Sequence, residues 1–418
     1  MRLLLEVILC SGAIGLLLPA TILLVEVLAA LLPETVTVGA TAERPPRAAI
    51  LVPAHNEEGQ IEATVRALVA DLPLGARILV IADNCSDQTA ALARRAGATA
   101  IERQDPSHVG KGHAISFGLR HLDADPPEIA ILVDADCRVS AGGLSALVWA
   151  AARGRRPIQA EYLIAAPRSS GPLVAVGALA ILLRNRVRPR GLRRLGLPCQ
   201  LTGSGMAFPW RLLRDAPETG SVLVEDLVMG IELALRGHPA QLCPAVQVSS
   251  ELPEGRAEGL RQRRRWEHGQ LHTLGTYLPR LIVAGVVQRR PALLGLGLDL
   301  LVPPLALLVM LQIGILVLAL GAASLGAVSF LAASLATVGL ALVGSAVVAA
   351  WTGFGRQTLP FRHLLFVPFY LVWKVPLYLA LLLKGRQKSW ERTARKSEMA
   401  PAALPPTAPE APPPDDTR

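Results

Sequence analysis

Three apolar segments in the first third of the chain each end in a cluster of acidic and amide side chains. The clusters are His55-Asn56-Glu57, Asp83-Asn84 and Asp134-Ala135-Asp136. Two carboxylates at positions i and i+2, such as Asp134 and Asp136, can hold a ligand and a hard divalent cation, because Mg²⁺ and Mn²⁺ prefer oxygen donors. The ordinary alternative for this pair is a strand-to-helix turn, where Asp is common.

A second acidic pair, Glu225-Asp226, precedes an apolar run of helical spacing over residues 227–235. A carboxylate at the start of a helix can serve as its N-cap and contribute about 1 kcal/mol. It can also act as a general base in a cleft. Taken alone, the pair is more typical of capping, and both interpretations stay open.

The run Gln-Arg-Arg-Arg-Trp at residues 262–266 lies on a predicted helix just before an apolar stretch. One interpretation is an interfacial anchor, with Arg at lipid phosphates and Trp at the headgroups. The other is a ligand site, in which Arg binds a pyrophosphate through two hydrogen bonds and Trp stacks on a sugar. The segment Thr202-Gly203-Ser204-Gly205 is likewise either a loop close to a ligand or a turn before a strand.

Residues 45 to about 250 alternate between apolar strands and helices. The predicted strands are 48–54, 76–83 and 128–136, and the predicted helices are 57–70, 86–96 and one from about residue 140. This alternation predicts a mostly parallel sheet covered on both faces. Ligands bind beyond the carboxyl ends of the strands in such sheets, which is where the three polar clusters stand.

Composition excludes several classes of protein. The 418 residues are 51% hydrophobic and 18% charged, which is unlike a disordered chain, a collagen or an ordinary soluble enzyme. The formal charge of +9 suits a cytosolic membrane face or phosphate-bearing ligands. Five scattered cysteines without a CxxC pair argue against a zinc ribbon or a disulfide framework. The chain also lacks GxGxxG and GxxxxGK[ST], so dinucleotide binding and P-loop hydrolysis are poorly supported.

The N-terminal segment 3–32 is apolar apart from Glu6 and Glu26. A helix of this length is roughly 45 Å long and crosses a bilayer with tilt. A cleaved signal peptide is the alternative, but its apolar region is normally about 7–15 residues long. We therefore expect a retained anchor. Arg44 and Arg47 follow it, which places the downstream side in the cytosol.

Residues 301–350 contain no charged side chain and are long enough for two spans, with the small-residue stretch 321–326 as the expected turn. A third apolar run, 364–383, is interrupted by two prolines and Lys374. If that run crossed the bilayer, the basic residues after it would lie outside the cell, against the positive-inside rule. We therefore expect a re-entrant or interfacial segment there.

These segments predict the domain organisation. It consists of an anchor (1–34), a cytosolic α/β domain (45–255), interfacial helices (256–290), transmembrane or re-entrant helices (291–383) and a basic, then proline-rich, disordered tail (384–418). The expected location is the inner membrane of the cell, with several spans. A short apolar segment, 171–183, precedes six arginines, which we expect at anionic lipid headgroups; a dock for a lipid-linked acceptor is the alternative.

Taken together and in order, seven short motifs resemble those of the family 2 glycosyltransferases, the membrane-embedded group that includes cellulose and hyaluronan synthases. The motifs are VPAHNE (52–57), IADNCSDQT (81–89), GKG (110–112), DAD (134–136), TGSGMAF (202–208), VEDLVMG (224–230) and QRRRW (262–266). The resemblance covers about residues 48–280 and the membrane layout on both sides. It implies a Rossmann-like GT-A domain inserted between an N-terminal transmembrane helix and a C-terminal helical membrane region.

The resemblance also implies roles for individual residues. The nucleotide sugar would be bound by Pro53, His55, Glu57, Asp83, Lys111 and Asp134. The acceptor and the diphosphate would be bound by Gly203, Ser204, Gln262, Arg265 and Trp266. Asp136 would ligate Mg²⁺ or Mn²⁺, and Asp226, beside Glu225, would be the catalytic base. Asn84 stands where many relatives carry a second acid, which leaves its role open.

The implied reaction moves a sugar from a nucleoside diphosphate sugar, by family expectation a UDP-sugar, to a glycan or lipid-linked acceptor with inversion. The expected pathway is exopolysaccharide or cell-envelope polysaccharide synthesis, with membrane lipids and export proteins as partners. The small number of spans counts against a self-contained export channel, so a single-sugar glycolipid transferase is the alternative.

Other classes are less well supported. A nucleotidyltransferase would need a glycine-rich basic loop early in the chain, which is missing. A non-catalytic scaffold is disfavoured because Asp136 and Asp226 are both present. Nucleic acid is not an expected partner, because the basic residues cluster beside apolar segments.

Overall fold

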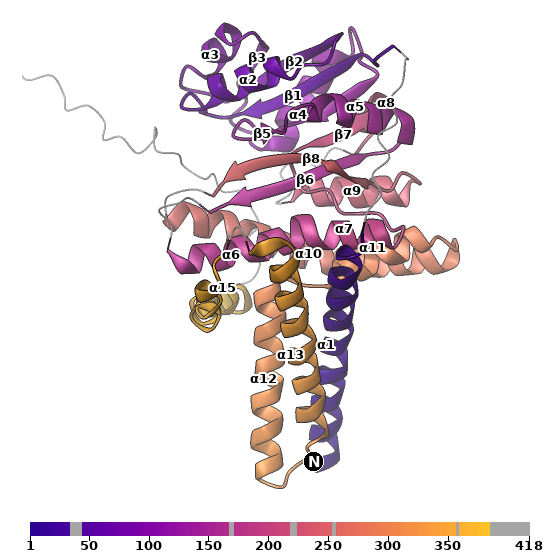
Figure 1. Ribbon diagram of the computed structural model, residues 1–418, viewed down its shortest axis with the longest axis vertical. Helices are drawn as coiled ribbons and strands as arrows, with labels where there is room; N and C mark the ends of the chain where they lie inside the picture. The colour runs from indigo at the N-terminus through magenta and orange to yellow at the C-terminus, as the bar shows by residue number, and fades with distance from the viewer. Residues whose placement is uncertain (34–43, 167–170, 218–223, 253–255, 357–358, 385–418) are drawn as a thin grey trace, which may run out of the picture.

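The computed structural model describes residues 1–33, 44–166, 171–217, 224–252, 256–356 and 359–384 of the chain. Figure 1 shows an α/β domain above a layer of helices, from which three long helices extend away from the sheet. The N-terminus lies at the far end of these long helices. The predicted disordered tail falls, except for its first residue, outside the described residues.

One sheet forms the α/β domain, and its eight strands in the described residues have the order β3-β2-β1-β4-β7-β6-β8-β5. The strands are β1 (Ala48–Ala54), β2 (Ala76–Asp83), β3 (Thr99–Arg103), β4 (Ile129–Leu132), β5 (Arg138–Val139), β6 (Ile158–Ala165), β7 (Met206–Pro209) and β8 (Gln241–Glu251). Neighbouring strands are parallel from β3 to β4 and between β6 and β8. Strand β7 is antiparallel to both neighbours, and β5 to β8. The prediction of a mostly parallel sheet is confirmed.

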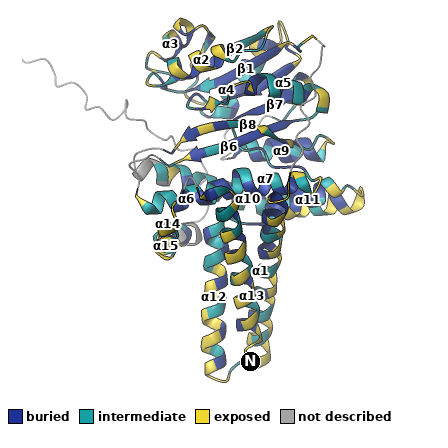
Figure 2. Ribbon diagram, in the orientation of Figure 1, coloured by how far each residue is buried: buried dark blue, intermediate teal, exposed yellow. Residues whose placement is uncertain are grey.

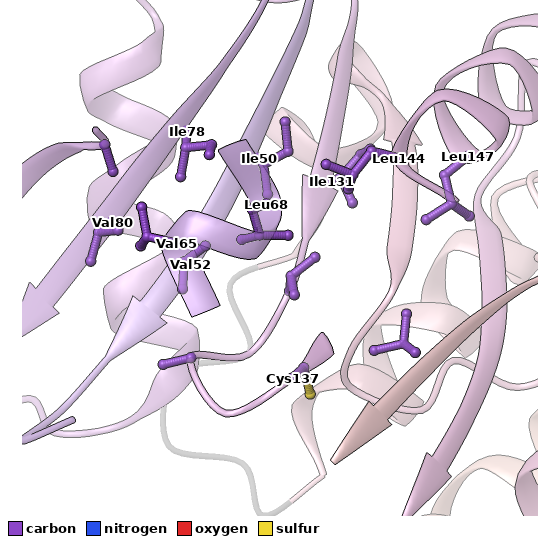
Figure 3. Close-up of a cluster of buried hydrophobic side chains, with 14 of the residues drawn as sticks. Ile50, Val52, Val65, Leu68, Ile78, Val80, Ile131, Cys137, Leu144 and Leu147 are labelled. Carbon is purple, nitrogen blue, oxygen red and sulfur yellow. The ribbon is translucent and has the colours of Figure 1, made fainter. Parts of the chain in front are cut away.

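Both faces of the sheet are buried because β1 and β4 are apolar at every position and β2 is apolar from Ile78 to Ala82. Ile50 and Val52 pack on one face under α2 (Ile61–Ala70), α3 (Thr89–Arg95) and α5 (Gly143–Gly154), as Figure 3 shows for part of this cluster. Leu51 points to the other face, under α4 (Lys111–Leu122), α8 (Trp210–Arg214) and α9 (Glu225–Leu235). This two-sided burial holds the strands rigidly, so their carboxyl ends form a fixed platform.

Three helices are long and apolar enough to cross a membrane. They are α1 (Arg2–Ala30), α12 (Leu305–Ser324) and α13 (Leu331–Ala350), the last continued by the π-helical turn η2 (Trp351–Gly355). The predicted pair of helices within 301–350 is present, although the turn between them falls a few residues after 321–326. Side chains such as Leu23, Leu308 and Val343 pack the three helices together.

The outer faces of these helices remain apolar and exposed, as the yellow positions in Figure 2 show. Val317 and Leu318 of α12 are 63% and 64% exposed. Water disfavours contiguous apolar surface of this extent, so the surface needs a nonpolar environment around it.

The remaining helices form a layer between the sheet and the three long helices, except for the last two along the chain, which lie to one side of the long helices (Figure 1). They are α6 (Pro172–Leu182), η1 (Leu183–Val187), α7 (Arg188–Arg194), α10 (Arg256–Val287), α11 (Pro291–Leu301), α14 (Phe361–Leu364) and α15 (Val367–Lys384). Helix α15, in the run predicted to be re-entrant or interfacial, does not run alongside α12 and α13. It lies near α6 instead, with Tyr370 packed in the same cluster as Val176.

The arginines after α6 turn inward. Arg188 of α7 donates to Glu26 of α1 at 2.7 Å and to Asp299 of α11 at 2.5 Å, and all three side chains are at least nine-tenths buried. Arg190 pairs with Glu161 of β6, which is fully buried. The expectation that these two arginines lie at lipid headgroups is therefore wrong, because buried carboxylates on three other elements bind them from within the protein.

Loss of the Arg188 charge should destabilise the whole chain. Arg188→Met leaves the carboxylates of Glu26 and Asp299 buried without their cation, which costs about 3–5 kcal/mol when one partner of a buried pair is removed. We expect a clear drop in the apparent melting temperature of the full chain in detergent. Arg66→Met is the control, because its pair with Glu62 is largely exposed and contributes at most about 1 kcal/mol. Equal melting temperatures for both variants would contradict the role of Arg188.

Candidate active site

The turn after β4 carries a cluster of potential metal ligands. One ligand atom from each of Asp134, Asp136 and Cys137 lies within 4.8 Å of the others. Burial, with the nearby charge of Asp134, raises the pKa of the Cys137 thiol well above its ordinary value. A thiol that stays protonated is a poor ligand for a hard cation. The donors that fit Mg²⁺ or Mn²⁺ are thus the two carboxylates.

Lys111 binds this cluster from the N-terminus of α4. Its Nζ pairs with Asp134, donates to the backbone oxygen of Gly203 at 2.6 Å, and lies 4.0 Å from Oε1 of Glu225. Burial by itself lowers the pKa of Lys111, but the charges of Asp134 and Glu225 outweigh burial and raise it above its ordinary value. Lys111 is therefore a permanent positive charge among the acids.

The segment Thr202–Gly205 forms a tight loop against the same turn. Ser204 is fully buried, and its Oγ accepts a hydrogen bond from the backbone N–H of Asp134 at 3.1 Å. Gln159 of β6 holds the loop at two points, donating to the oxygen of Ser204 at 2.8 Å and accepting from the N–H of Thr202 at 2.9 Å. Sequence reasoning missed Gln159, although a buried amide within the apolar strand IQAEYLIA is a usable signal.

Glu225 and Asp226 stand in the first turn of α9, and neither is its N-cap, since Val224 occupies that position. An ideal Cβ at Gly203 would lie 3.1 Å from Oδ2 of Asp226, so the glycine leaves room for the carboxylate to approach the loop. Burial first, and the charge of Asp226 second, raise the pKa of Glu225 to about 7. A cavity of about 160 Å³ adjoins both acids and Lys111.

Side chains of the 262–266 run lie in two different environments. The positive charge of Arg265 lowers the pKa of Glu225, which places it near the acids. Trp266 packs against the sheet and lines a different cavity beneath it. Gln262 is half-buried, and none of the described residues donates a hydrogen bond to its Oε1. Of the three residues predicted here, Arg265 is the one whose charge acts on the acids.

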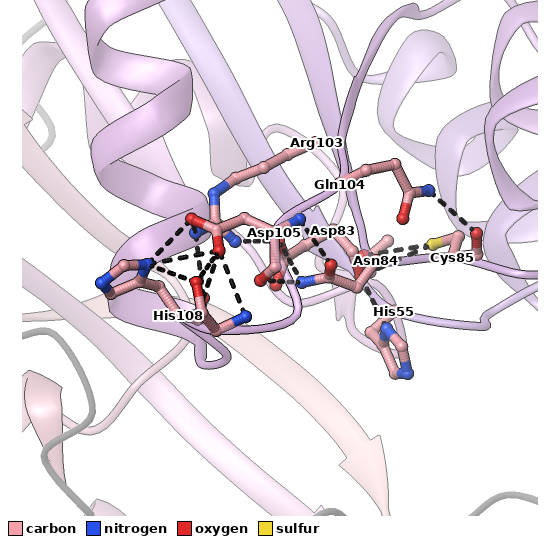
Figure 4. A network of polar contacts seen from close by, with 10 residues as sticks. His55, Asp83, Asn84, Cys85, Arg103, Gln104, Asp105 and His108 are labelled. Carbon is pink, nitrogen blue, oxygen red and sulfur yellow. Dashed lines mark hydrogen bonds and ion pairs between the residues drawn. The ribbon is translucent and has the colours of Figure 1, made fainter.

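Asp83 belongs to a separate network at the ends of β2 and β3 (Figure 4). Its carboxylate accepts from Arg103 at 2.5 Å, and its backbone oxygen accepts from Nδ1 of His55 at 2.6 Å. Asn84 donates to Asp83 at 3.1 Å and accepts from the N–H of Asp105 at 2.7 Å. Asn84 also has a φ of +52°, which Asn tolerates better than most residues. Asn84 therefore connects the loops that follow β2 and β3.

Strand β1 joins the two regions, since it lies between β2 and β4 in the sheet. Pro53 is the second-last residue of β1. Glu57 lies three residues beyond the strand, is buried, and donates its backbone N–H to Oγ1 of Thr89 at 2.8 Å. Arg103 was not predicted from the sequence. Its place at the carboxyl end of β3 is a usable signal, because the neighbouring strands carry their functional groups at the same edge.

Comparison with known proteins agrees with this geometry. The family described as "Glycosyltransferase like family 2" matches residues 45–269. The chain belongs to this family. Uncharacterised glycosyltransferases of Mycobacterium bovis and of Mycobacterium tuberculosis are each 30% identical over 205 residues, which cover 41% of this chain and 86% of theirs. The chain is accordingly a glycosyltransferase that uses nucleotide sugars, as its motifs predicted.

A solved structure extends the comparison to the helices. It is that of a mannosyltransferase from Pyrobaculum calidifontis in complex with GDP-Man and Mn²⁺. It matches with a TM-score of 0.53 at 18% identity, covering 90% of this chain and 100% of that one. At this identity the likeness shows the fold alone, and it confirms the predicted GT-A class of this family 2 glycosyltransferase.

The raised pKa of Glu225 predicts a pH-dependent stability. The ordinary pKa is 4.5 and the folded one about 7, so the folded chain binds more protons than the unfolded chain between these values. Stability therefore falls as the pH rises from about 4.5 through 7. We expect the melting temperature in EDTA to fall over this window, and Glu225→Gln to flatten the slope. Glu102→Gln, at an exposed position on β3, is the control; a slope unchanged by Glu225→Gln would contradict the assignment.

Proposed function

We propose that this glycosyltransferase adds a single sugar to a lipid-linked acceptor, with inversion at the anomeric carbon, at the cytosolic face of the inner membrane of the cell. The observation that carries the proposal is the convergence of Asp134, Asp136 and Asp226 around Lys111 at the carboxyl edge of the sheet. Parallel α/β sheets bind ligands at this edge. A cavity of about 160 Å³ adjoins Lys111 and Asp226 in this cluster.

The donor side of the site consists of two regions. The Asp83 network and His55 offer hydrogen-bonding groups for a nucleobase and its ribose, with Pro53 and Glu57 beside them on β1. Asp136, with Asp134, would hold Mg²⁺ or Mn²⁺, and such an ion would offset the charge of a departing diphosphate. Arg265 supplies a fixed positive charge on the same side, and Ser204 orients the Asp134 turn through its backbone.

The chemical step needs one base. Asp226 accepts the proton of the acceptor hydroxyl while that oxygen attacks the anomeric carbon. The bond from the anomeric carbon to the diphosphate oxygen breaks at the opposite face, and its electron pair leaves with the nucleoside diphosphate. A single displacement inverts the configuration. Gly203 allows Asp226 to lie against the loop that faces Asp134, which brings base and donor together.

Packing of the long helices favours single-sugar transfer over polymer synthesis. Helices α1, α12 and α13 pack directly on one another through Leu23, Val27, Leu308 and Val343. A growing polysaccharide would need a wide polar path through them. The sequence favoured a polysaccharide synthase first, and this packing supports its alternative. With three spans, the α/β domain and the chain after α13 lie on one side of the bilayer, as the basic residues near both favour.

Incubation of the purified full chain with nucleotide sugars tests the proposal. The chain is placed in liposomes of bacterial lipid extract, a panel of labelled UDP- and GDP-sugars is added with Mn²⁺, and lipid and aqueous products are sized. We expect one lipid product larger by a single sugar. A ladder of long products would establish the polysaccharide synthase instead, and labelled soluble glycans alone would reject a lipid acceptor.

Asp226→Asn should remove transfer while preserving donor binding. Loss of a general base lowers kcat by about 10²–10⁴-fold. The affinity for the nucleotide sugar, measured by titration calorimetry, should change less than about threefold, because Asp226 acts on the acceptor. Asp215→Asn, at an exposed site after α8, is the matched control and should have full activity. Near-normal turnover of Asp226→Asn would exclude Asp226 as the base.

Metal dependence tests the role of Asp136. We expect EDTA to abolish transfer and Mn²⁺ or Mg²⁺ to restore it. Asp136→Asn removes one of two carboxylate ligands, so we expect about tenfold or more Mn²⁺ to be needed for half-maximal donor binding. Electron paramagnetic resonance of bound Mn²⁺ measures the same change without activity. Unchanged Mn²⁺ binding in this variant would place the ion elsewhere.

A further inference from the structure

A second cavity, of about 90 Å³, lies below the acids, between α6, α10 and the ends of α1 and α12 nearest the sheet. Part of its wall is apolar and comes from the long helices and their connections, including Leu23, Val302 and Leu305. The charged part of the wall consists of Arg184, Arg188, Arg263 and Glu267. A hollow that joins apolar helix ends to several arginines is unusual, because charged side chains rarely line buried space without partners.

Two of the charged groups already have partners. Arg188 is bound by Glu26 and Asp299. Glu267 pairs with Lys374 of α15. These contacts leave the charges of Arg184 and Arg263 without a carboxylate of their own at the cavity.

Arg184 has neither a hydrogen bond nor an ion pair with any described residue, and its Nε is buried. Burial lowers the pKa of Arg184 from its ordinary value, but guanidinium groups stay protonated in proteins. Arg263 is 7% exposed, and its Nη1 is buried without a hydrogen-bond partner in the described part of the chain. Its guanidinium lies 5.8 Å from the ring centre of Trp373, a contact that leaves the charge in place.

Removing a cation from water is unfavourable unless an anion pairs with it. Arg184, which is half-buried, and Arg263, which is buried, face one cavity without an ion pair among the described residues, which indicates that an anion completes the site. The planar guanidinium fork matches the oxygen geometry of phosphate, and a pair of forks can bind several oxygens of one phosphate group. We propose that this cavity binds the phosphate of a membrane lipid between Arg184 and Arg263, with the hydrocarbon chain of the lipid along α1 and α12.

The wall of the cavity distinguishes a lipid phosphate from a free one. Leu23 and Leu305 belong to helices that are long and apolar enough to cross a membrane. Exposed positions continue along both helices away from the sheet (Figure 2), and large apolar side chains such as Ile14, Leu18 and Val317 are among them. Basic pockets at this depth between membrane helices are suited to anionic headgroups. A free phosphate would find the charge but would bury no apolar surface.

The position of the cavity connects the lipid to the catalytic acids. Asp226 acts on Arg184 electrostatically, so the proposed base and the phosphate site are neighbours. Helix α10 contributes to both sites from different faces. The positive charge of Arg265 acts on Glu225, whereas Arg263, Trp266 and Glu267 line the cavity. On the proposed function, which this inference extends, the lipid held here is the acceptor, and its phosphate sets its depth.

Titration calorimetry of the full chain in detergent tests the site with three probes. Farnesyl phosphate carries both features, farnesol lacks the phosphate, and inorganic phosphate lacks the chain. We expect farnesyl phosphate to bind about tenfold or more tightly than either of the others, because each of the others lacks one of the two groups that the cavity contacts. Equal affinity for farnesol would overturn the phosphate site, and equal affinity for inorganic phosphate would overturn the lipid.

Variants of the arginines give the second readout. Arg184→Gln with Arg263→Gln should weaken farnesyl phosphate by about tenfold or more and leave farnesol unchanged. The lysine pair should recover part of the affinity, because lysine keeps the charge but loses the fork. Arg261→Gln, at an exposed position on the same helix, is the control and should bind normally. Unchanged affinity in the glutamine pair would refute the proposal.

A third variant keeps every charge and tests the site even if the double arginine variant fails to fold. Gly177 of α6 packs on Arg263, and a Cβ there would lie 2.6 Å from Nη1. Gly177→Ala therefore displaces the guanidinium. We expect this variant to bind farnesyl phosphate several-fold more weakly and to bind farnesol normally. Unaltered binding in this variant and in Arg263→Gln would remove Arg263 from the site.

Binding of the nucleotide sugar with Mn²⁺, measured in each variant, separates this inference from the proposed function. If the chain binds the nucleotide sugar but does not prefer farnesyl phosphate to farnesol, the lipid site is refuted and the proposed function stands. If the chain prefers farnesyl phosphate but binds no nucleotide sugar, the proposed function is refuted and the lipid site stands.

Discussion

The buried charge of Arg188 constrains the structure more than any other single interaction. A guanidinium that is taken out of water must be paired, and Arg188 finds its partners on α1 and α11, which are far apart in the sequence. The neighbouring Arg190 binds Glu161 in the sheet. Through α7, one short run of arginines thus connects the catalytic domain to the N-terminal helix. The orientation of the sheet above the long helices follows from these pairings.

Charge balance also organises the catalytic edge. Five ionisable groups gather at the ends of β4, α4 and α9, and each acid raises the cost of ionising the next one. Lys111 reduces the electrostatic repulsion among these acids, because it pairs with Asp134 and lies near Glu225. A surplus of negative charge remains, which a divalent cation and a cationic transition state both suit. The same crowding of acidic groups therefore favours the binding of a cation.

Helix α10 contributes side chains both to the catalytic acids and to the cavity beside the long helices. One face presents Arg265 to the acids, and the next presents Arg263 and Trp266 to the cavity among the helix ends. A motif that reads as a single unit in the sequence serves two sites, because successive residues of a helix point about 100° apart. On the proposed function, one rigid helix would contact both the donor and the acceptor, which would keep their separation constant.

Hydrophobic patterns and the order of the motifs were enough to predict the local elements and the family of this chain. Strands 48–54 and 76–83, the long N-terminal helix and the helical pair within 301–350 follow from hydrophobic runs, whose period and length depend only on neighbouring residues. Tertiary structure decided which charges meet. Arg103, Gln159 and Arg188 find partners at sequence separations that no local pattern encodes, and Asn84 serves as a link between loops. The physical reason is that pairing of buried charges depends on the distances and burial that packing creates.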